Sequence, residues 1–288
     1  MTAATAGHAG GRPWGLWRRQ VGAIARLELR RVLRSRMAVI GWGLASLPVL
    51  LLALRALVVA LGYAEGLDGG QALDETVYAM VYQTLMLRLS VFFGCLAVFV
   101  NAIRGEAYAR TLHYYLLAPL RREVLAAGKF VGGLLGTALI FGGAVLATRV
   151  IMLVGPSGWV EAALRTMTAG PWLWHTLAYL GVTLLACAGY GAVFLVIGLW
   201  RVNPIIPSVL VFGWEAVNAF LPAALQRVSI VHALLALCPV PVNLGPIAIL
   251  GEPPSRPVAA LELAVVTALL VALAMRRARG LEALYGED

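Results

Sequence analysis

The chain has 288 residues, of which 61% are hydrophobic and only 13% are charged, and its formal net charge is +9. Soluble domains carry about 25% charged residues, so this composition excludes a water-soluble globular protein. It predicts an all-α polytopic membrane protein. The positive charge comes from 22 arginines and one lysine, and in a membrane protein it indicates topology rather than nucleic-acid binding.

The N-terminal residues 1–36 hold eight arginines, which predicts a cytoplasmic N-terminus without a signal peptide. Within them, 17–36 has apolar residues at three- and four-residue spacing and arginines on the opposite face, as in an amphipathic helix. We expect this helix to lie in the membrane interface and to contact lipids; a solvated helix before the first span is the alternative. The residues selected for it are Trp17, Glu28, Arg30 and Arg34.

Long apolar runs follow, and a run of roughly 20 such residues can span a bilayer. Six spans are predicted, at 37–61, 77–103, 130–153, 173–200, 205–225 and 258–275, which together form a transmembrane domain over 37–275. Seventeen of the 23 basic residues fall in the N-terminus, the 104–129 loop, Arg201 and the tail 276–288. Because basic residues stay inside, both termini are expected to be cytoplasmic, in the cytoplasmic membrane of a bacterial cell.

Two segments within this domain carry unusual chemistry. Arg88 and Glu215 fall at middle depth of the second and fifth predicted spans, where a charge costs roughly 2.5–3.5 kcal/mol. We expect them to lie close together, either as a structural ion pair or beside a polar pathway. The outer segment 226–257 is apolar but interrupted by prolines, so it predicts a re-entrant or interfacial helical element, with a surface loop as the alternative.

The loop 104–129 lies between the second and third spans and is predicted to be cytoplasmic. Leu112, Tyr115 and Leu116 give it an apolar face, which charged residues flank on both sides. An apolar face in a water-facing loop must be covered by something, and acidic residues at both ends disfavour an anionic lipid surface. A docking surface for a soluble protein is therefore predicted, and an ordinary cytoplasmic hairpin is the alternative.

The same loop resembles the first cytoplasmic loop of ABC type-2 transporter permeases. The matching positions are Glu106, Thr111, Leu116, Leu117, Pro119, Arg121 and Lys129. Arg110 departs from the pattern, because the family usually has glycine there. The Leu27-Glu28-Leu29 segment, followed by Arg34-Ser-Arg36, also resembles the family's interfacial elbow helix. Six spans and a long apolar segment before the last span are similar too, so the resemblance covers nearly the whole chain.

This resemblance implies a permease subunit of an ABC exporter. It would pair with a second permease chain, identical or paralogous, and with two copies of an ABC ATPase subunit that bind ATP and Mg. The residues expected to couple to the ATPase are Glu106, Arg110, Thr111, Leu112, Tyr115, Leu116 and Arg121. The chain itself lacks a P-loop, since Gly128-Lys129 is followed by Phe130, and no cofactor is expected on it.

No catalytic or metal-binding residues are nominated, because the four histidines are scattered and no nucleophile set stands out. Gly128, Gly132 and Gly136 form small-residue steps that favour close helix packing. Two other functions remain as alternatives: an intramembrane lipid-acting enzyme and a non-transporting membrane scaffold.

Overall fold

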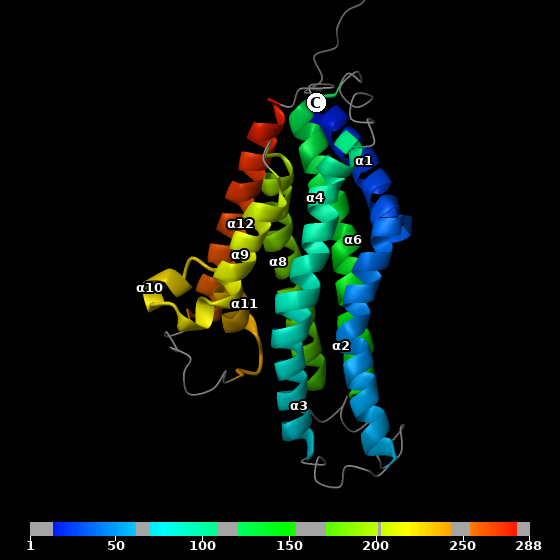
Figure 1. Cartoon of the computed structure of the whole chain (residues 1–288), viewed down its shortest axis with the longest axis vertical. Helices are drawn as coiled ribbons and strands as arrows, with labels where there is room; N and C mark the ends of the chain where they lie inside the picture. Colours follow the sequence, from blue (N-terminus) through cyan, green and yellow to red (C-terminus); the bar gives the residue numbers. More distant parts are fainter. Residues whose placement is uncertain are drawn as a thin grey trace, which may run out of the picture.

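The structure is a computed structural model that describes residues 14–61, 70–108, 120–153, 171–200, 203–242 and 254–280. These residues are almost entirely helical, and most helices run along the long axis of one bundle (Figure 1). The helices are α1 (Trp14–Arg34), α2 (Arg36–Ala60), α3 (Gly70–Val81), η1 (Tyr82–Val91), α4 (Phe92–Tyr108), α6 (Arg122–Ile151), α8 (Trp172–Gly198), α9 (Ile205–Ala216), η2 (Asn218–Phe220), α10 (Ala223–Gln226), α11 (Ile230–Leu237) and α12 (Arg256–Ala278).

Within the described residues, five helices are long and apolar enough to cross a membrane. They are Ala38–Ala60, Asp74–Glu106, Arg122–Ile151, Trp172–Gly198 and Arg256–Ala278. Helices suit this environment because they satisfy their own backbone hydrogen bonds where water is absent. The prediction of a membrane-embedded helical protein is confirmed at this level, but six spans are not confirmed.

The fifth predicted span, 205–225, is where the structure differs. Its helix, α9, has 12 residues, or about 18 Å at the rise of an α-helix, which falls short of a hydrocarbon core about 30 Å thick. The chain turns after Ala216, and two buried amides hold this turn. Asn218 donates to the Gln226 carbonyl at 3.3 Å, and the Gln226 side chain donates to the Leu221 carbonyl at 2.8 Å. Hydropathy could not reveal this turn, because most of its residues are apolar.

The short helix α11 follows this turn and packs against α8 and α12. Val231 and Leu234 are fully buried, and Ile230 packs beside Gly189 of α8 and close to Leu263 of α12. The segment 226–257, which was predicted to be external, therefore contains a largely buried helix at 230–237. Residues 243–253 of that segment lie outside the described residues.

The helices α8 and α12 end at the same end of the bundle, since the Arg277 guanidinium lies 5.0 Å from the centroid of the Trp200 ring. Arg121 beside α6 and Trp17 of α1 also meet there, with the guanidinium 4.5 Å from the ring centroid. The start of α1 and the end of α12 thus share one end of the molecule (Figure 1). We call it the terminal end.

Close helix packing in the core depends on glycine at two facing positions. Phe99 of α4 is fully buried, and its ring lies against Gly133 of α6 and Gly191 of α8. A Cβ atom at Gly133 would lie 2.8 Å from the ring, and one at Gly191 would lie 2.6 Å from it. Both distances are too short for real carbon contacts, so these glycines let three helices meet around one aromatic ring.

The predicted packing role of the small-residue steps in α6 is confirmed. Gly128 faces Ile24, Gly132 faces the backbone of Ala25, and Gly136 faces Val32. Because these contacts advance together along both helices, α1 runs alongside α6 in the same direction. The expectation that α1 lies flat in the membrane interface is not confirmed by this arrangement.

Candidate functional site

A buried group of charges joins α1, α4 and α6 near the terminal end. We call Glu28, Arg31, Glu106 and Lys129 the Lys129 cluster. The Lys129 ammonium lies 2.7 Å from a Glu106 oxygen, 3.3 Å from a Glu28 oxygen and 2.7 Å from the Ala102 carbonyl. The Arg31 guanidinium adds a second contact to Glu106 at 3.0 Å. Three separate helices are thereby connected through one lysine.

The Lys129 cluster balances its charges in a largely buried site. Lys129 is 0% exposed, and Glu28 and Glu106 are each 5% exposed. Two carboxylates face two cations, so the formal charge is neutral, as a buried ionic site requires. Burial raises the pKa of the Glu28 carboxyl above its ordinary value, while Lys129 and Arg31 oppose the rise. Burial therefore disfavours the charged form of Glu28.

The cluster borders the loop that the sequence singles out. Glu106 lies two residues before the end of α4, and Lys129 lies in the second turn of α6. Residues 109–119, which connect these helices, lie outside the described residues. The helix ends on both sides of this loop are thus tied to each other and to α1.

Further contacts hold the start of α6 and the end of α4 at this end of the bundle. The Arg122 side chain donates to the Arg279 carbonyl at 2.9 Å, and the Arg279 side chain pairs with Glu123. Arg104 donates to the carbonyls of Gly198 and Trp200, so it satisfies acceptors that the end of α8 leaves free. These contacts link the helices that flank the loop to α8 and α12.

The structure brings together some of the residues selected from the sequence. Glu28 and Glu106 meet at Lys129, and Arg121 meets Trp17. Arg30 and Arg34 are exposed on the other side of α1. The remaining predicted coupling residues lie outside the described residues: Arg110, Thr111, Leu112, Tyr115 and Leu116.

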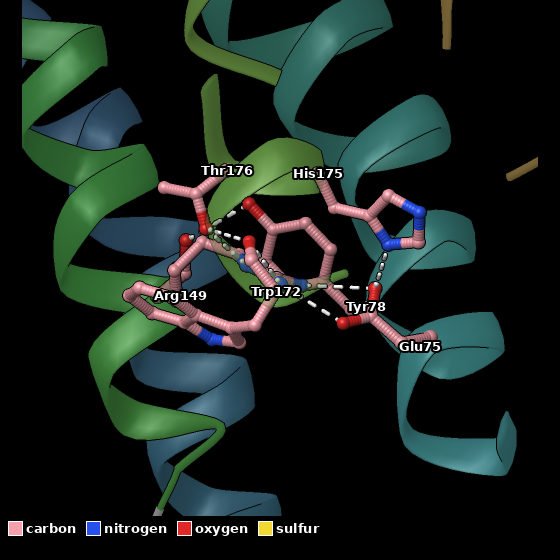
Figure 2. A network of polar contacts seen from close by, with 7 residues as sticks. Glu75, Tyr78, Arg149, Trp172, His175 and Thr176 are labelled. Carbon is pink, nitrogen blue, oxygen red and sulfur yellow. Dashed lines mark hydrogen bonds and ion pairs between the residues drawn. The ribbon is translucent and has the colours of Figure 1, made fainter. Parts of the chain in front are cut away.

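A second polar group lies at the opposite end of α6, and we call it the Arg149 cluster. The Arg149 guanidinium binds both carboxylate oxygens of Glu75, at 2.8 and 3.0 Å, and donates to the Thr176 hydroxyl at 3.1 Å. Figure 2 shows Arg149 and His175 approaching the same Glu75 carboxylate, with the histidine nitrogen at 3.3 Å. The rings of Tyr78 and Trp172 lie 4.8 and 5.4 Å from the guanidinium.

This cluster was not predicted from the sequence. Arg149 stands near the end of an apolar run, where a long side chain is expected to extend into water, yet it is 1% exposed. One signal was available in the sequence. The acidic Glu75 lies just before the start of one predicted span and Arg149 lies near the end of another, so both are expected at the same depth in the membrane. Arg55 and Asp74 form a second ion pair between these ends.

Arg88 and Glu215, the predicted intramembrane pair, line one cavity of about 210 Å³ with Thr84, Leu89, Tyr190, Phe212 and Ala216. Among the described residues, no ion pair joins them. Glu215 instead accepts from the Ser229 hydroxyl at 2.8 Å and from the backbone N–H groups of Ile230 and Val231 at 3.1 and 2.9 Å. The two side chains therefore line the same cavity, but no direct contact between them neutralises their charges.

Comparison with known protein families and with curated proteins finds no match for this chain. Among the described residues, no group of three or more His, Cys, Asp or Glu side chains could hold a metal ion.

Proposed function

We propose that the chain is the membrane-spanning permease subunit of an ABC exporter, driven by a separate ATPase subunit. A second permease chain would complete a pathway between the two copies. The ATPase would dock on the loop at 109–119, where Leu112, Tyr115 and Leu116 supply apolar anchors. The chain would sit in the cytoplasmic membrane with both termini on the ATPase side.

The Lys129 cluster is the observation that carries this proposal. A force-transmitting loop needs both of its flanking helices tied into the bundle, because a loose end would absorb the motion. Glu106 and Lys129 supply this tie at 2.7 Å, and Glu28 and Arg31 extend it to α1. A buried ion pair often gives less net stability than apolar packing in the same place would. The ion pair between the two helices that flank the loop therefore supports a role in coupling more than a role in simple anchoring.

The broken region between α8 and α12 fits the same proposal. Both helices end at the terminal end, so the chain from 203 to 255 must return to the far side before α12 begins. It does so through short pieces, α9 and α11, of which α11 is buried. We propose that this segment is a re-entrant element that replaces a regular fifth span. Irregular backbone of this kind is tolerated where protein surrounds it.

The test is purification of the chain in mild detergent from cells that co-express a candidate P-loop ATPase from the same genome neighbourhood. We expect stoichiometric binding and ATP hydrolysis. Tyr115→Asp should abolish both, because a charge would be placed at the centre of an apolar interface, where truncation effects are largest. Arg121→Ala is the matched control on the rim, and it should retain most of the bound ATPase.

The outcome decides between the proposal and its alternatives. An ATPase that binds the wild type and the Arg121→Ala variant, but not Tyr115→Asp, supports the permease. An ATPase that binds equally well to Tyr115→Asp would exclude the loop as the docking element. Hydrolysis that never depends on this chain would favour a scaffold or an enzyme instead.

A further inference from the structure

The cavity beside Arg88 is lined by this cation, by the Glu215 carboxylate and by several apolar side chains. Arg88 projects from η1, and its Nη2 atom is buried without a hydrogen-bond partner among the described residues. Leu89 and Phe212 are apolar members of the lining, and Tyr190 of α8 adds an aromatic ring. A buried guanidinium donor without an acceptor is costly, so this nitrogen calls for an acceptor that the described part of the chain does not supply.

Glu215 is the natural candidate for this acceptor, but its oxygens are already engaged. They accept from Ser229, Ile230 and Val231, and the Tyr190 hydroxyl lies 3.4 Å away. These contacts fix the carboxylate at the start of α11, where backbone N–H groups favour a negative charge. Glu215 is therefore committed to the turn after α9, and the Nη2 donor of Arg88 remains available.

The surroundings indicate what kind of molecule could enter. The helix α9 presents exposed apolar side chains, with Val209 60% and Leu210 69% exposed, and these would face lipid in a membrane. Phe212 of the same helix lines the cavity and is itself 37% exposed. The cavity thus borders an apolar surface, so a chain-bearing molecule could reach it from the bilayer.

The local backbone is also unusual at this point. Residues 82–91 form a π-helix within an otherwise α-helical segment, and Arg88 lies in it. Such segments are rare and are frequently found at functional sites, because the widened turn redirects side chains. Here the widened turn contains the residue with the unpartnered donor.

We infer that this cavity binds the anionic head of an amphiphile, a phosphate or carboxylate, with Arg88 as its ligand and the apolar tail directed toward α9. The guanidinium would donate to the head group, and the tail would cover Leu89, Phe212 and the exposed side of α9. Binding at this site does not require the proposed ATPase partner, so this inference can be tested independently of the proposed function.

The probe is dodecyl phosphate, added to the full chain purified in the neutral detergent dodecyl maltoside. The unfolding temperature is followed as the mole fraction of dodecyl phosphate in the micelle rises. We expect a saturable increase. Arg88→Gln should weaken the apparent affinity at least tenfold, because a hydrogen bond between charged groups is among the stronger polar contacts. Arg256→Gln removes an exposed arginine elsewhere and should leave the affinity unchanged.

Two further arms keep the test decisive. Ala216→Leu would fill part of the cavity while keeping Arg88, and it should also abolish the saturable shift, even if Arg88→Gln fails to fold. Inorganic phosphate alone should give no shift at the same concentration. An equal shift in unfolding temperature with inorganic phosphate would mean that the site binds a free anion rather than an amphiphile. A shift that survives Ala216→Leu, or that Arg256→Gln reduces as much as Arg88→Gln does, would overturn the site.

Discussion

Lys129 and Arg149 are two buried cations on the same helix, and they are held in different ways. The planar guanidinium of Arg149 forms a bidentate ion pair with both oxygens of one carboxylate, and aromatic rings lie close to it. Lys129 is a point charge shared among Glu28, Glu106 and a helix carbonyl. A bidentate guanidinium contact fixes the relative orientation of the two side chains, whereas an ammonium can redistribute its hydrogen bonds as its partners move. The Lys129 end of α6 is thus the better suited to transmit motion.

The largest expected effect comes from removing the shared cation. Lys129→Met leaves two buried carboxylates with only the partly exposed Arg31 to offset them. It should destabilise the protein by about 3–5 kcal/mol, as breaking a buried pair typically does. Thermal unfolding in detergent measures it, with the exposed Arg30→Met as control. Equal stability of the two variants would contradict the assignment of the Lys129 cluster as a buried ionic site.

A conservative substitution should reveal how much the bidentate geometry contributes at the Arg149 cluster. Arg149→Lys keeps the charge but loses the two-point contact with Glu75 and the stacking between rings. We expect a loss of about 1–3 kcal/mol in unfolding free energy. Arg55→Lys is the control, because Arg55 makes an ion pair with Asp74, which is 42% exposed. Comparable small losses at both sites would mean that fork geometry is not what holds Arg149.

The contact between α1 and α6 can be changed without touching any charge. A Cβ atom at Gly132 would lie 2.6 Å from the Ala25 carbonyl oxygen and 2.7 Å from Glu28 Cβ. Gly132→Ala should therefore push α1 away and cost about 1–3 kcal/mol, as overpacking does. Gly143→Ala, which meets nothing within 4 Å, should be close to neutral in the same unfolding assay. A neutral Gly132→Ala would show that α1 is not seated on α6.

The smallest effect is expected at Glu28 and depends on pH. Because the folded-state pKa of Glu28 is raised, acidification through that pKa protonates the folded protein first and stabilises it relative to the unfolded chain. Glu28→Gln lacks this gain. The difference in unfolding temperature between wild type and variant should therefore move in favour of the wild type as pH falls from 7 toward the ordinary range of a carboxyl. A difference that does not vary with pH would contradict the raised pKa.

The helices were largely predictable from the sequence, because long apolar runs have few alternatives in a bilayer. The first predicted span, 37–61, differs from α2 by one residue at each end. The third, 130–153, missed the start of α6 at Arg122, since hydropathy does not detect a helix that continues through charged residues. The fifth ran past Ala216 because the turn there depends on the buried amides of Asn218 and Gln226 rather than on polarity.

The candidate site was predictable only in part. Glu28 was selected as part of the amphipathic helix, and Glu106 and Lys129 were selected as matching positions of the resemblance near the two ends of the 104–129 loop. Their meeting could not be predicted, since it depends on the rotation of three helices and on the glycines that bring α1 onto α6. Arg149 was missed because a position near the end of a span is compatible with both exposure and burial.

In the proposed permease, motion of the 109–119 loop reaches the bundle through the Lys129 cluster. The most direct measurement uses Trp174→Cys, at a position that is 69% exposed near the Arg149 cluster, in a chain whose native cysteines are all buried. Its labelling rate is compared with and without ATP and vanadate, in complex with the proposed ATPase subunit. The same measurement is made on a variant that also carries Glu106→Gln and Lys129→Gln together, a pair of changes that keeps the cluster neutral.

We expect the nucleotide to change the labelling rate when the Lys129 cluster is intact. The double variant should still bind the ATPase but lose this change. A nucleotide-dependent change of the same size in the double variant would contradict the claim, because motion would then reach the far end of the bundle without the cluster.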